Sequence, residues 1–302
     1  MIKNIKNDSL TWYHIINPGD NDFLFLTNNF DFHPLDIEDC RSKTQRPKID
    51  IYEDYYFLIL HFPLQSSTNK NLITKEIKIF WSEKYVITIC HAKGVIDELF
   101  NKTKENSELQ VNLFKSSSDS LLYKILELLL IDALTLFNSV GEEVELINKQ
   151  LFNKRAEKTI EKISITRKNI IFLDTIFKPQ LRLFKKLESG VIKGYADDME
   201  EYWGNILDYY QKLWDMVEDY KEIIEGLSKT FDSLQTNKIN EIMKILTIFS
   251  SIMLPLTFVT GLYGMNIVLP FQSHQNSFLI VCGMLAAVII SLLVFFKKRK
   301  WL

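Results

Sequence analysis

Cysteine, glycine and proline are all scarce in this chain of 302 residues. It contains ten glycines, seven prolines and only three cysteines, Cys40, Cys90 and Cys282. Three widely separated cysteines provide neither a disulfide framework nor the spacing of zinc ligands, so the sequence fits a reducing compartment. With 47% hydrophobic residues and little glycine or proline, the chain cannot be disordered, collagen-like or of low complexity. Its length allows two domains of about 150 residues each.

Charge is also absent from one long stretch. Residues 245–296 contain no Asp, Glu, Lys or Arg, although 25% of the whole chain is charged. The four residues that follow, 297–300, are all basic. Removing them leaves 36 − 4 = 32 basic residues against 38 acidic ones, so the region before the uncharged stretch has a net charge near −6. The chain has no overall basic charge of the kind that would indicate a nucleic-acid partner.

The uncharged stretch holds two apolar runs, about 245–263 and 278–296. A helix needs about 20 apolar residues to cross a lipid bilayer. We therefore predict transmembrane spans at about 242–264 and 277–297, joined by the short loop 264–276. A buried hairpin in a soluble core is the alternative, but two consecutive uncharged runs that end in a basic cluster argue against it.

The basic cluster also predicts the orientation in the membrane. Lys and Arg residues that flank a span stay in the cytoplasm. Two spans return the chain to the same side, and the N-terminus has no apolar signal region. We expect a multi-pass protein of the cell (inner) membrane with both termini cytoplasmic, so that only the loop 264–276 faces outside.

The region before the spans has two parts. Within residues 1–115, apolar runs predict a buried strand at 55–62, a hairpin of 77–81 with 85–90, and a helix at 95–101. From 116 to 241 helical periodicity dominates, with long helices at about 121–152 and 154–187, the second kinked or interrupted by Pro179. The predicted fold class is α+β: an N-terminal mixed α/β cytoplasmic domain (1–115), a long-helix stalk (116–241) and a transmembrane domain (242–302).

The stalk continues into the first span. Apolar residues spaced alternately by three and four positions predict a coiled-coil stripe. Its members are Met199, Tyr202, Ile206, Tyr209, Leu213, Met216, Tyr220, Ile223 and Leu227. No proline follows before Pro255, so one helix is expected from about Asp197 through the first span.

The same spacing leads to a partly small and polar face within the lipid. Its members are Asn240, Met243, Thr247, Ser250, Leu254, Thr257 and Gly261. Small and hydroxyl residues in a span either pack helices closely or line a water-filled path. Two spans cannot enclose a pore, so a pore requires an oligomer. The predicted coiled-coil stripe on the stalk provides a surface through which chains could associate.

The first span ends in Tyr263-Gly264-Met265-Asn266. Here the sequence resembles the CorA family of divalent-cation (magnesium/cobalt) transporters, whose signature is Gly-Met-Asn at the end of the first of two C-terminal spans. The resemblance extends to residues 240–247 and 253–258. It also includes His33-Pro34-Leu35 with Glu38-Asp39, and Arg46-Pro47-Lys48-Ile49 with Tyr52 and Asp54.

The resemblance implies a homopentamer with a funnel-shaped cytoplasmic part and a central pore lined by the first span. Gly264, Met265 and Asn266 would form its outer, selective mouth. Asn240, Met243, Leu246, Leu254 and Thr257 match pore-lining positions, and Thr247, Ser250 and Gly261 share their face. Two departures from the family are visible. The resemblance implies acidic residues in the loop between the spans, where this chain has only His274 as a titratable group. It also implies aspartates at a regulatory metal site, where ungapped counting places Asn205, with Asp208 one turn later.

These features predict a channel for Mg²⁺ uptake, with Co²⁺ and Ni²⁺ as further candidates. No nucleotide motif is visible, so the membrane potential would drive transport. The sequence contains no recognisable catalytic motif that would indicate an enzyme. One alternative is a proton-coupled Zn²⁺ transporter of the same superfamily. Met265 is evidence against it, because the resemblance implies that the zinc-transporting branch commonly has Ile at this position. A two-span membrane sensor is another, although the loop 264–276 is small for receiving a signal.

Overall fold

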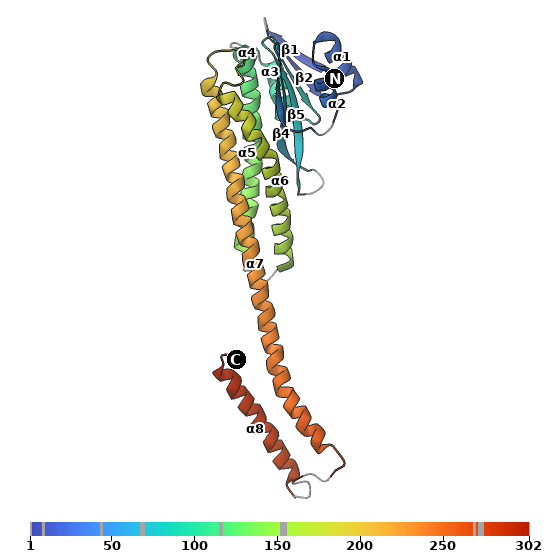
Figure 1. Ribbon diagram of the computed structural model, residues 1–302, viewed down its shortest axis with the longest axis vertical. Coiled ribbons are helices and arrows are strands. Elements are labelled where there is room, and N and C mark those ends of the chain that lie inside the picture. The colour runs from blue at the N-terminus through green and yellow to red at the C-terminus, as the bar shows by residue number, and fades with distance from the viewer. Residues whose placement is uncertain are drawn as a thin grey trace. The chain divides into compact units, whose positions relative to one another are not determined.

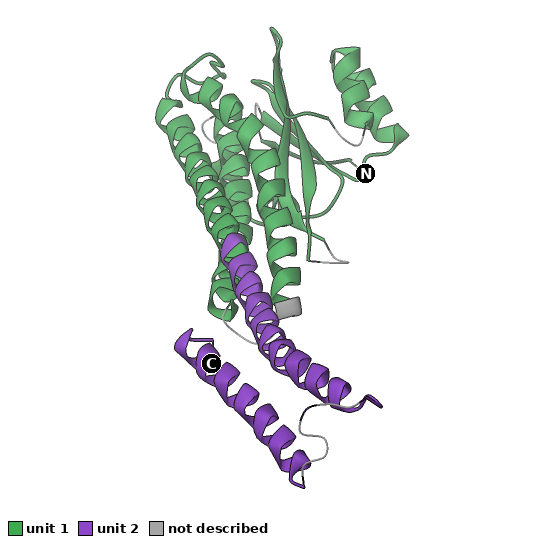
Figure 2. Cartoon of the chain, turned by 60° about the horizontal axis from the view of Figure 1, so that its bottom comes forward, with its two compact units in different colours: residues 1–228 green, residues 229–302 purple. Residues whose placement is uncertain are grey.

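The computed structural model describes residues 2–7, 10–42, 45–66, 70–114, 117–151, 156–267, 270 and 275–301. The chain divides into two compact units, Met1–Ser228 and Lys229–Leu302 (Figure 2). The long helix α7 contributes residues to both units.

A six-stranded sheet with the order β1-β2-β6-β5-β4-β3 forms the centre of the first unit (Figure 1). Its strands are β1 (Ile2–Asn7), β2 (Leu10–Ile16), β3 (Lys48–Ile51), β4 (Tyr56–Gln65), β5 (Leu72–Trp81) and β6 (Tyr85–Cys90). Only β2 and β6 pair in parallel; the other neighbours are antiparallel. The predicted hairpin is confirmed as β5–β6, and the predicted buried strand as β4.

Helices cover both faces of the sheet, which explains why consecutive residues of its central strands are buried rather than alternately buried and exposed. Helices α1 (Asp20–Asn29) and α2 (Pro34–Arg41) cover one face through a core that includes Leu26, Cys40, Phe57 and Phe80. Helices α5 (Ser118–Gln150) and α6 (Ala156–Glu188) lie along the other face (Figure 1). Helices α3 (Val95–Glu105) and α4 (Ser107–Phe114) pack against α5.

The predicted helix after residue 116 begins where expected, since Ser117 caps α5 by accepting a hydrogen bond from the backbone N–H of Ser120 at 3.3 Å. Of the two effects expected at Pro179, a kink or an interruption, the structure excludes the interruption, because α6 runs through this proline. The neighbouring Gln180 is fully buried and holds this turn against β4. Its amide nitrogen donates to the carbonyls of Ile176 (3.0 Å) and His61 (2.8 Å), and its oxygen accepts from the His61 N–H (2.8 Å). The sheet therefore supports the helix where proline removes a donor.

Helix α7 (Glu200–Tyr263) is continuous, as predicted. The predicted stripe is only half right. Ile206 and Leu213 are buried, but Tyr202 is 49% exposed and Ile223 is 46% exposed. The residues one position later are buried instead: Trp203, Tyr210, Val217 and Ile224. Trp203 packs edge-on against Trp81 at 5.9 Å, and Tyr210 packs on Phe184 at 4.4 Å between ring centres. The buried stripe is therefore displaced by one position from part of the predicted one.

The connection between α6 and α7 uses two glycines with left-handed backbone, Gly190 (φ 69°) and Gly194 (φ 70°). At Gly194 an added Cβ would collide with Asp119 Oδ1 and approach the Trp81 ring, whereas at Gly190 it would meet nothing within 4 Å. The Tyr195 N–H donates to the same Asp119 oxygen at 3.0 Å, so the close approach fixes this connection to α5.

Gly194→Ala should therefore destabilise the first unit more than Gly190→Ala. We expect about 1 kcal/mol for Gly190→Ala, from the left-handed backbone alone. Gly194→Ala should cost roughly 2–3 kcal/mol because the clash adds to the same backbone strain. Urea unfolding of the full chain, followed by tryptophan fluorescence, measures both. Equal losses would show that the contact with Asp119 relaxes freely.

The second unit is a helical hairpin made by the end of α7 and α8 (Ser277–Lys298) (Figure 2). Both helices are long and apolar enough to cross a membrane, and no part of their most apolar 18-residue windows is buried within the chain. Such surface is unstable in water and suits lipid or other copies of the chain.

Candidate functional site

The predicted pore face lies along the second half of α7. Its positions fall on about one third of the helix circumference because steps of three and four residues return to the same side. They are Asn240, Met243, Leu246, Thr247, Ser250, Leu254, Thr257 and Gly261, and all are exposed in the single chain. Leu254 is 74% exposed. The face is therefore free in one chain to meet lipid, water or further copies.

Two threonines on this face have their hydroxyl hydrogens engaged within the helix. Thr247 Oγ1 donates to the Met243 carbonyl at 2.8 Å, and Thr257 Oγ1 donates to the Met253 carbonyl at 2.9 Å. A hydroxyl that donates to its own helix keeps its oxygen lone pairs for accepting hydrogen bonds. The face thus offers hydrogen-bond acceptors to water molecules between its aliphatic side chains.

The predicted mouth follows directly on the last helical turn. Helix α7 ends at Tyr263, and the N–H groups of Gly264 and Met265 still donate to the carbonyls of Thr260 (2.9 Å) and Leu262 (3.2 Å). Gly264, Met265 and Asn266 are exposed. The Tyr263 hydroxyl donates to the Pro270 carbonyl at 3.3 Å and ties the helix end to the loop. His274 lies outside the described residues.

Gly264 is needed for space rather than for a left-handed backbone. Its φ is not positive, unlike those of Gly190 and Gly194. An added Cβ would lie 3.3 Å from the Thr260 carbonyl oxygen, closer than ordinary van der Waals contact. An added side chain would therefore require this contact to widen by a few tenths of an ångström.

The predicted regulatory pair is not brought together as a metal site within one chain. Asn205 is half-buried, and its amide nitrogen donates to the Tyr123 hydroxyl at 2.8 Å. That hydroxyl donates to Glu127 at 3.2 Å, and burial raises the pKa of Tyr123 so that it keeps this proton. Asp208, one turn later on α7, is exposed and shares a shallow hollow with Asp215 and Asp219. Among the described residues, no three His, Cys, Asp or Glu side chains gather closely enough to hold a metal ion.

A contact that sequence reasoning missed joins α7 to the end of α8. Lys244 Nζ donates to the Lys300 carbonyl at 3.2 Å. Lys300 has a left-handed backbone (φ 56°), which turns Trp301 back to stack on buried Phe296 at 5.8 Å between ring centres. The basic cluster signals its position beside a membrane, but no local pattern shows that the chain folds back here.

The chain matches the family model of CorA-like Mg²⁺ transporter protein over residues 7–299. It is 26% identical over 275 residues to the cobalt/magnesium transport protein CorA of Thermotoga maritima, covering 90% of this chain and 78% of that protein. It is 24% identical over 237 residues to the zinc transport protein ZntB of Yersinia enterocolitica, covering 75% of this chain and 68% of that protein. Its fold is similar to that of the CorA magnesium transporter from Methanocaldococcus jannaschii, with a TM-score of 0.83, 20% identity and coverage of 99% and 93%.

Proposed function

Because the chain belongs to the family of CorA-like Mg²⁺ transporter proteins, we propose that it is a homopentameric channel for Mg²⁺ uptake. Membership confirms the family predicted from the end of the first span, together with the fold class. Members are divalent-cation transporters rather than enzymes, which removes the sensor as a candidate. The observation that carries the proposal is this family match, because it includes the helix that ends in Gly264-Met265-Asn266.

In the proposed pentamer the exposed face of α7 lines the pore, and Asn266 meets the ion at the mouth. Mg²⁺ holds its water molecules tightly. A ring of amide oxygens can accept hydrogen bonds from that water shell without removing it. Neutral ligands also bind weakly enough to release the ion, as conduction requires. The exposure of Asn266 immediately after α7 supports this role.

The same arrangement supplies a gate. In the pentamer, Met243, Leu246 and Leu254 would each form an apolar ring, and a narrow apolar ring closes a pore by losing its water. The acceptor oxygens of Thr247 and Thr257 would help to hydrate the path between these rings when it opens. Ser250 and Gly261 share the face and keep it wide.

The driving force in this proposal is the membrane potential. With both termini cytoplasmic and the protein in the inner membrane, a divalent cation moving inward gains roughly 4.6 kcal/mol per 100 mV. We also propose that Mg²⁺ binds as a regulator beside Asn205 and Asp208 at the contact between subunits. Because Asn205 is neutral and engaged with Tyr123, that regulation should be weaker than with two carboxylates.

A proton-coupled Zn²⁺ transporter is the second candidate, because a zinc transport protein is similar over 75% of this chain. Ion flux into liposomes that contain the purified protein separates the two. With an imposed potential and no pH gradient, we expect Mg²⁺ to accumulate inside and Zn²⁺ to accumulate more slowly. Zn²⁺ movement that requires a pH gradient, without Mg²⁺ movement, would replace the channel proposal. Protein-free liposomes are the control for leakage.

A further inference from the structure

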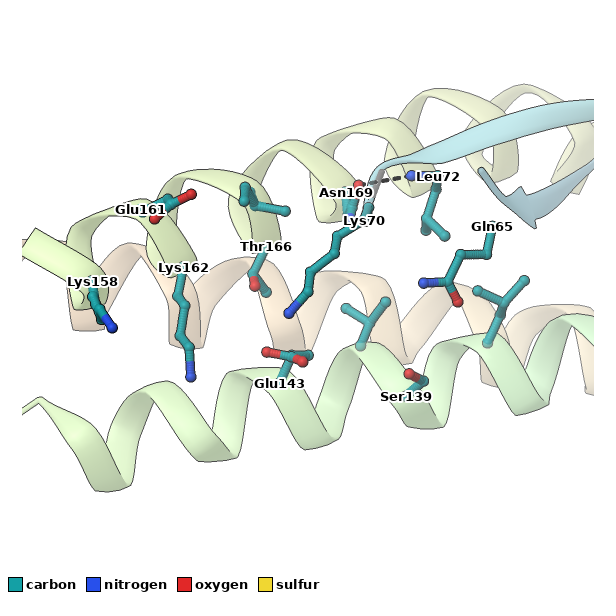
Figure 3. Close-up of a pocket in the computed structure, with 13 residues that line it drawn as sticks. Gln65, Lys70, Leu72, Ser139, Glu143, Lys158, Glu161, Lys162, Thr166 and Asn169 are labelled. Atoms are coloured by element: carbon teal, nitrogen blue, oxygen red, sulfur yellow. Dashed lines mark hydrogen bonds between the residues drawn. The ribbon is translucent and has the colours of Figure 1, made fainter. Parts of the chain in front are cut away.

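A half-enclosed cavity of about 300 Å³ lies in the first unit, far along the chain from the proposed ion path. Helices α5 and α6 form its sides, and the end of β4 and the start of β5 contribute Gln65 and Leu72 to its lining (Figure 3). Every residue discussed below is among those that the structure describes. The cavity has no part in the proposed transport mechanism.

The inner wall of the cavity is aliphatic. Leu72, Leu136, Val140 and Ile165 line it, and no aromatic ring is among the described lining residues. Buried Thr166 and Asn169 interrupt this surface on the α6 side. A ligand that fits this wall needs an aliphatic body, since nothing here stacks on the ring of a nucleotide base.

Hydrogen bonds hold the cavity in shape. Asn169 Oδ1 accepts from the Leu72 N–H at 3.0 Å, and Asn169 Nδ2 donates to the Lys70 carbonyl at 2.9 Å. This one side chain therefore fixes the start of β5 to α6. Lys162 is held by Gln150 Oε1 at 3.0 Å. A site that exists before the ligand arrives loses less entropy on binding.

The rim of the cavity is cationic. Figure 3 shows Lys70, Lys158 and Lys162 extending into the space between α5 and α6, while Glu161 points away from it. Within the described parts of the chain, none of the three lysines forms an ion pair. Of the two carboxylates among the described lining residues, Glu143 on α5 extends toward the lysines. Three ammonium groups around one opening stand out in a region with a net charge near −6.

We propose that this cavity binds a small amphipathic anion, with an aliphatic body and a single carboxylate or phosphate head. The body covers the wall of Leu72, Leu136, Val140 and Ile165, and the head lies among the three lysines. Glu143 disfavours a second negative charge on the ligand. A chain of about six carbons fits the volume. The proposal does not depend on the proposed function, since a transporter of any ion would keep the cavity.

Lysine acylation of the full chain in lipid nanodiscs tests the proposal. A dilute amine-acetylating reagent would be applied in the presence of hexanoate, hexyl phosphate, hexanol or inorganic phosphate. The extent of acetylation at each lysine would then be measured by mass spectrometry. With either amphipathic anion at about four times its Kd, Lys70, Lys158 and Lys162 should react about fivefold more slowly. Lys168, which is exposed on α6 outside the cavity, should react at an unchanged rate.

Two variants make the test specific. Ser139→Trp fills the opening from an exposed position on α5, and Lys158→Gln removes one cation; both should reduce protection of the remaining lysines. The two anions distinguish a carboxylate from a phosphate head. Equal protection by hexanol, equal protection by inorganic phosphate, equal slowing at Lys168, or no protection by either anion would each overturn the proposal.

Discussion

Replacing Asn266 with alanine is expected to abolish potential-driven Mg²⁺ influx without changing the fold. Asn266 is exposed and follows the last turn of α7, so truncating it removes no packing within the chain. A hydrogen bond to a charged partner contributes about 1.5–3 kcal/mol, and the proposed pentamer loses one from every subunit. Influx of Mg²⁺ into liposomes should therefore fall at least 100-fold, roughly what two such hydrogen bonds provide.

A matched control lies on α7 itself. Asn237→Ala makes the same chemical change at an exposed position off the pore face, and it should leave influx unchanged. Asn266→Asp tests the argument about weak binding. A ring of carboxylates should bind Mg²⁺ more tightly and conduct it more slowly. If the Asn266→Ala variant keeps its oligomeric size and still transports Mg²⁺ at the wild-type rate, Asn266 has no part in the mechanism.

The parts of the fold that the sequence predicts well are those set by local composition. The absence of charge from residues 245–296 is enough to place both apolar helices, because lipid tolerates few charged side chains. The hairpin β5–β6 follows from two apolar runs around a short polar turn. In both cases the physical cause lies within about 20 consecutive residues.

The face of α7 could not be predicted in the same way. Tyr202 and Trp203 are adjacent and apolar, and so are Tyr209 and Tyr210, so two neighbouring stripes have the same spacing. Only contacts with Trp81, Phe177 and Phe184 decide between them. These partners are far away in the sequence.

The same limit applies to polar contacts around the candidate sites. Asn205 binds Tyr123, Lys244 binds Lys300, and Asn169 joins β5 to α6. Each pair is at least 50 residues apart, so periodicity carries no sign of it. For the same reason, the sequence gives no sign of the cavity beside Asn169. It contains the three lysines of the rim, but it does not show that the fold brings them together.

The second large effect is expected at a buried ion pair in β5. Lys78 is 1% exposed, and its Nζ lies 2.8 Å from Glu76 Oε1 while donating to the carbonyls of Ser42 (2.8 Å) and Cys40 (3.3 Å). Glu76 also accepts from the Gln45 N–H at 2.9 Å. These contacts attach the end of α2 to the centre of the sheet, so the pair connects two layers of the first unit.

Lys78→Met should lower the free energy of local opening by about 3 kcal/mol, because it leaves the Glu76 carboxylate buried without its cation. Hydrogen exchange of the β5 amides should then become roughly 100-fold faster. Lys84→Met, in the exposed turn after β5, is the matched control and should change nothing. The double variant Lys78→Met/Glu76→Leu should recover most of the loss, since it removes both charges. No recovery would mean that the lysine acts through the Cys40 and Ser42 carbonyls instead.

The same pair predicts how stability depends on pH. Burial alone would raise the pKa of Glu76, but hydrogen bonds from His61, Lys78 and the Gln45 N–H outweigh it and lower this pKa. A carboxyl whose pKa is lower in the folded state stabilises the fold above its unfolded pKa, near 4.5, and loses that contribution as the pH falls. Exchange in β5 should therefore be slower in the wild type than in Glu76→Gln at pH 7, after correction for intrinsic rates. The difference should shrink below about pH 4.5, where a protonated Glu76 resembles glutamine. A difference that persists to pH 3 would show that shape, rather than charge, distinguishes the two side chains.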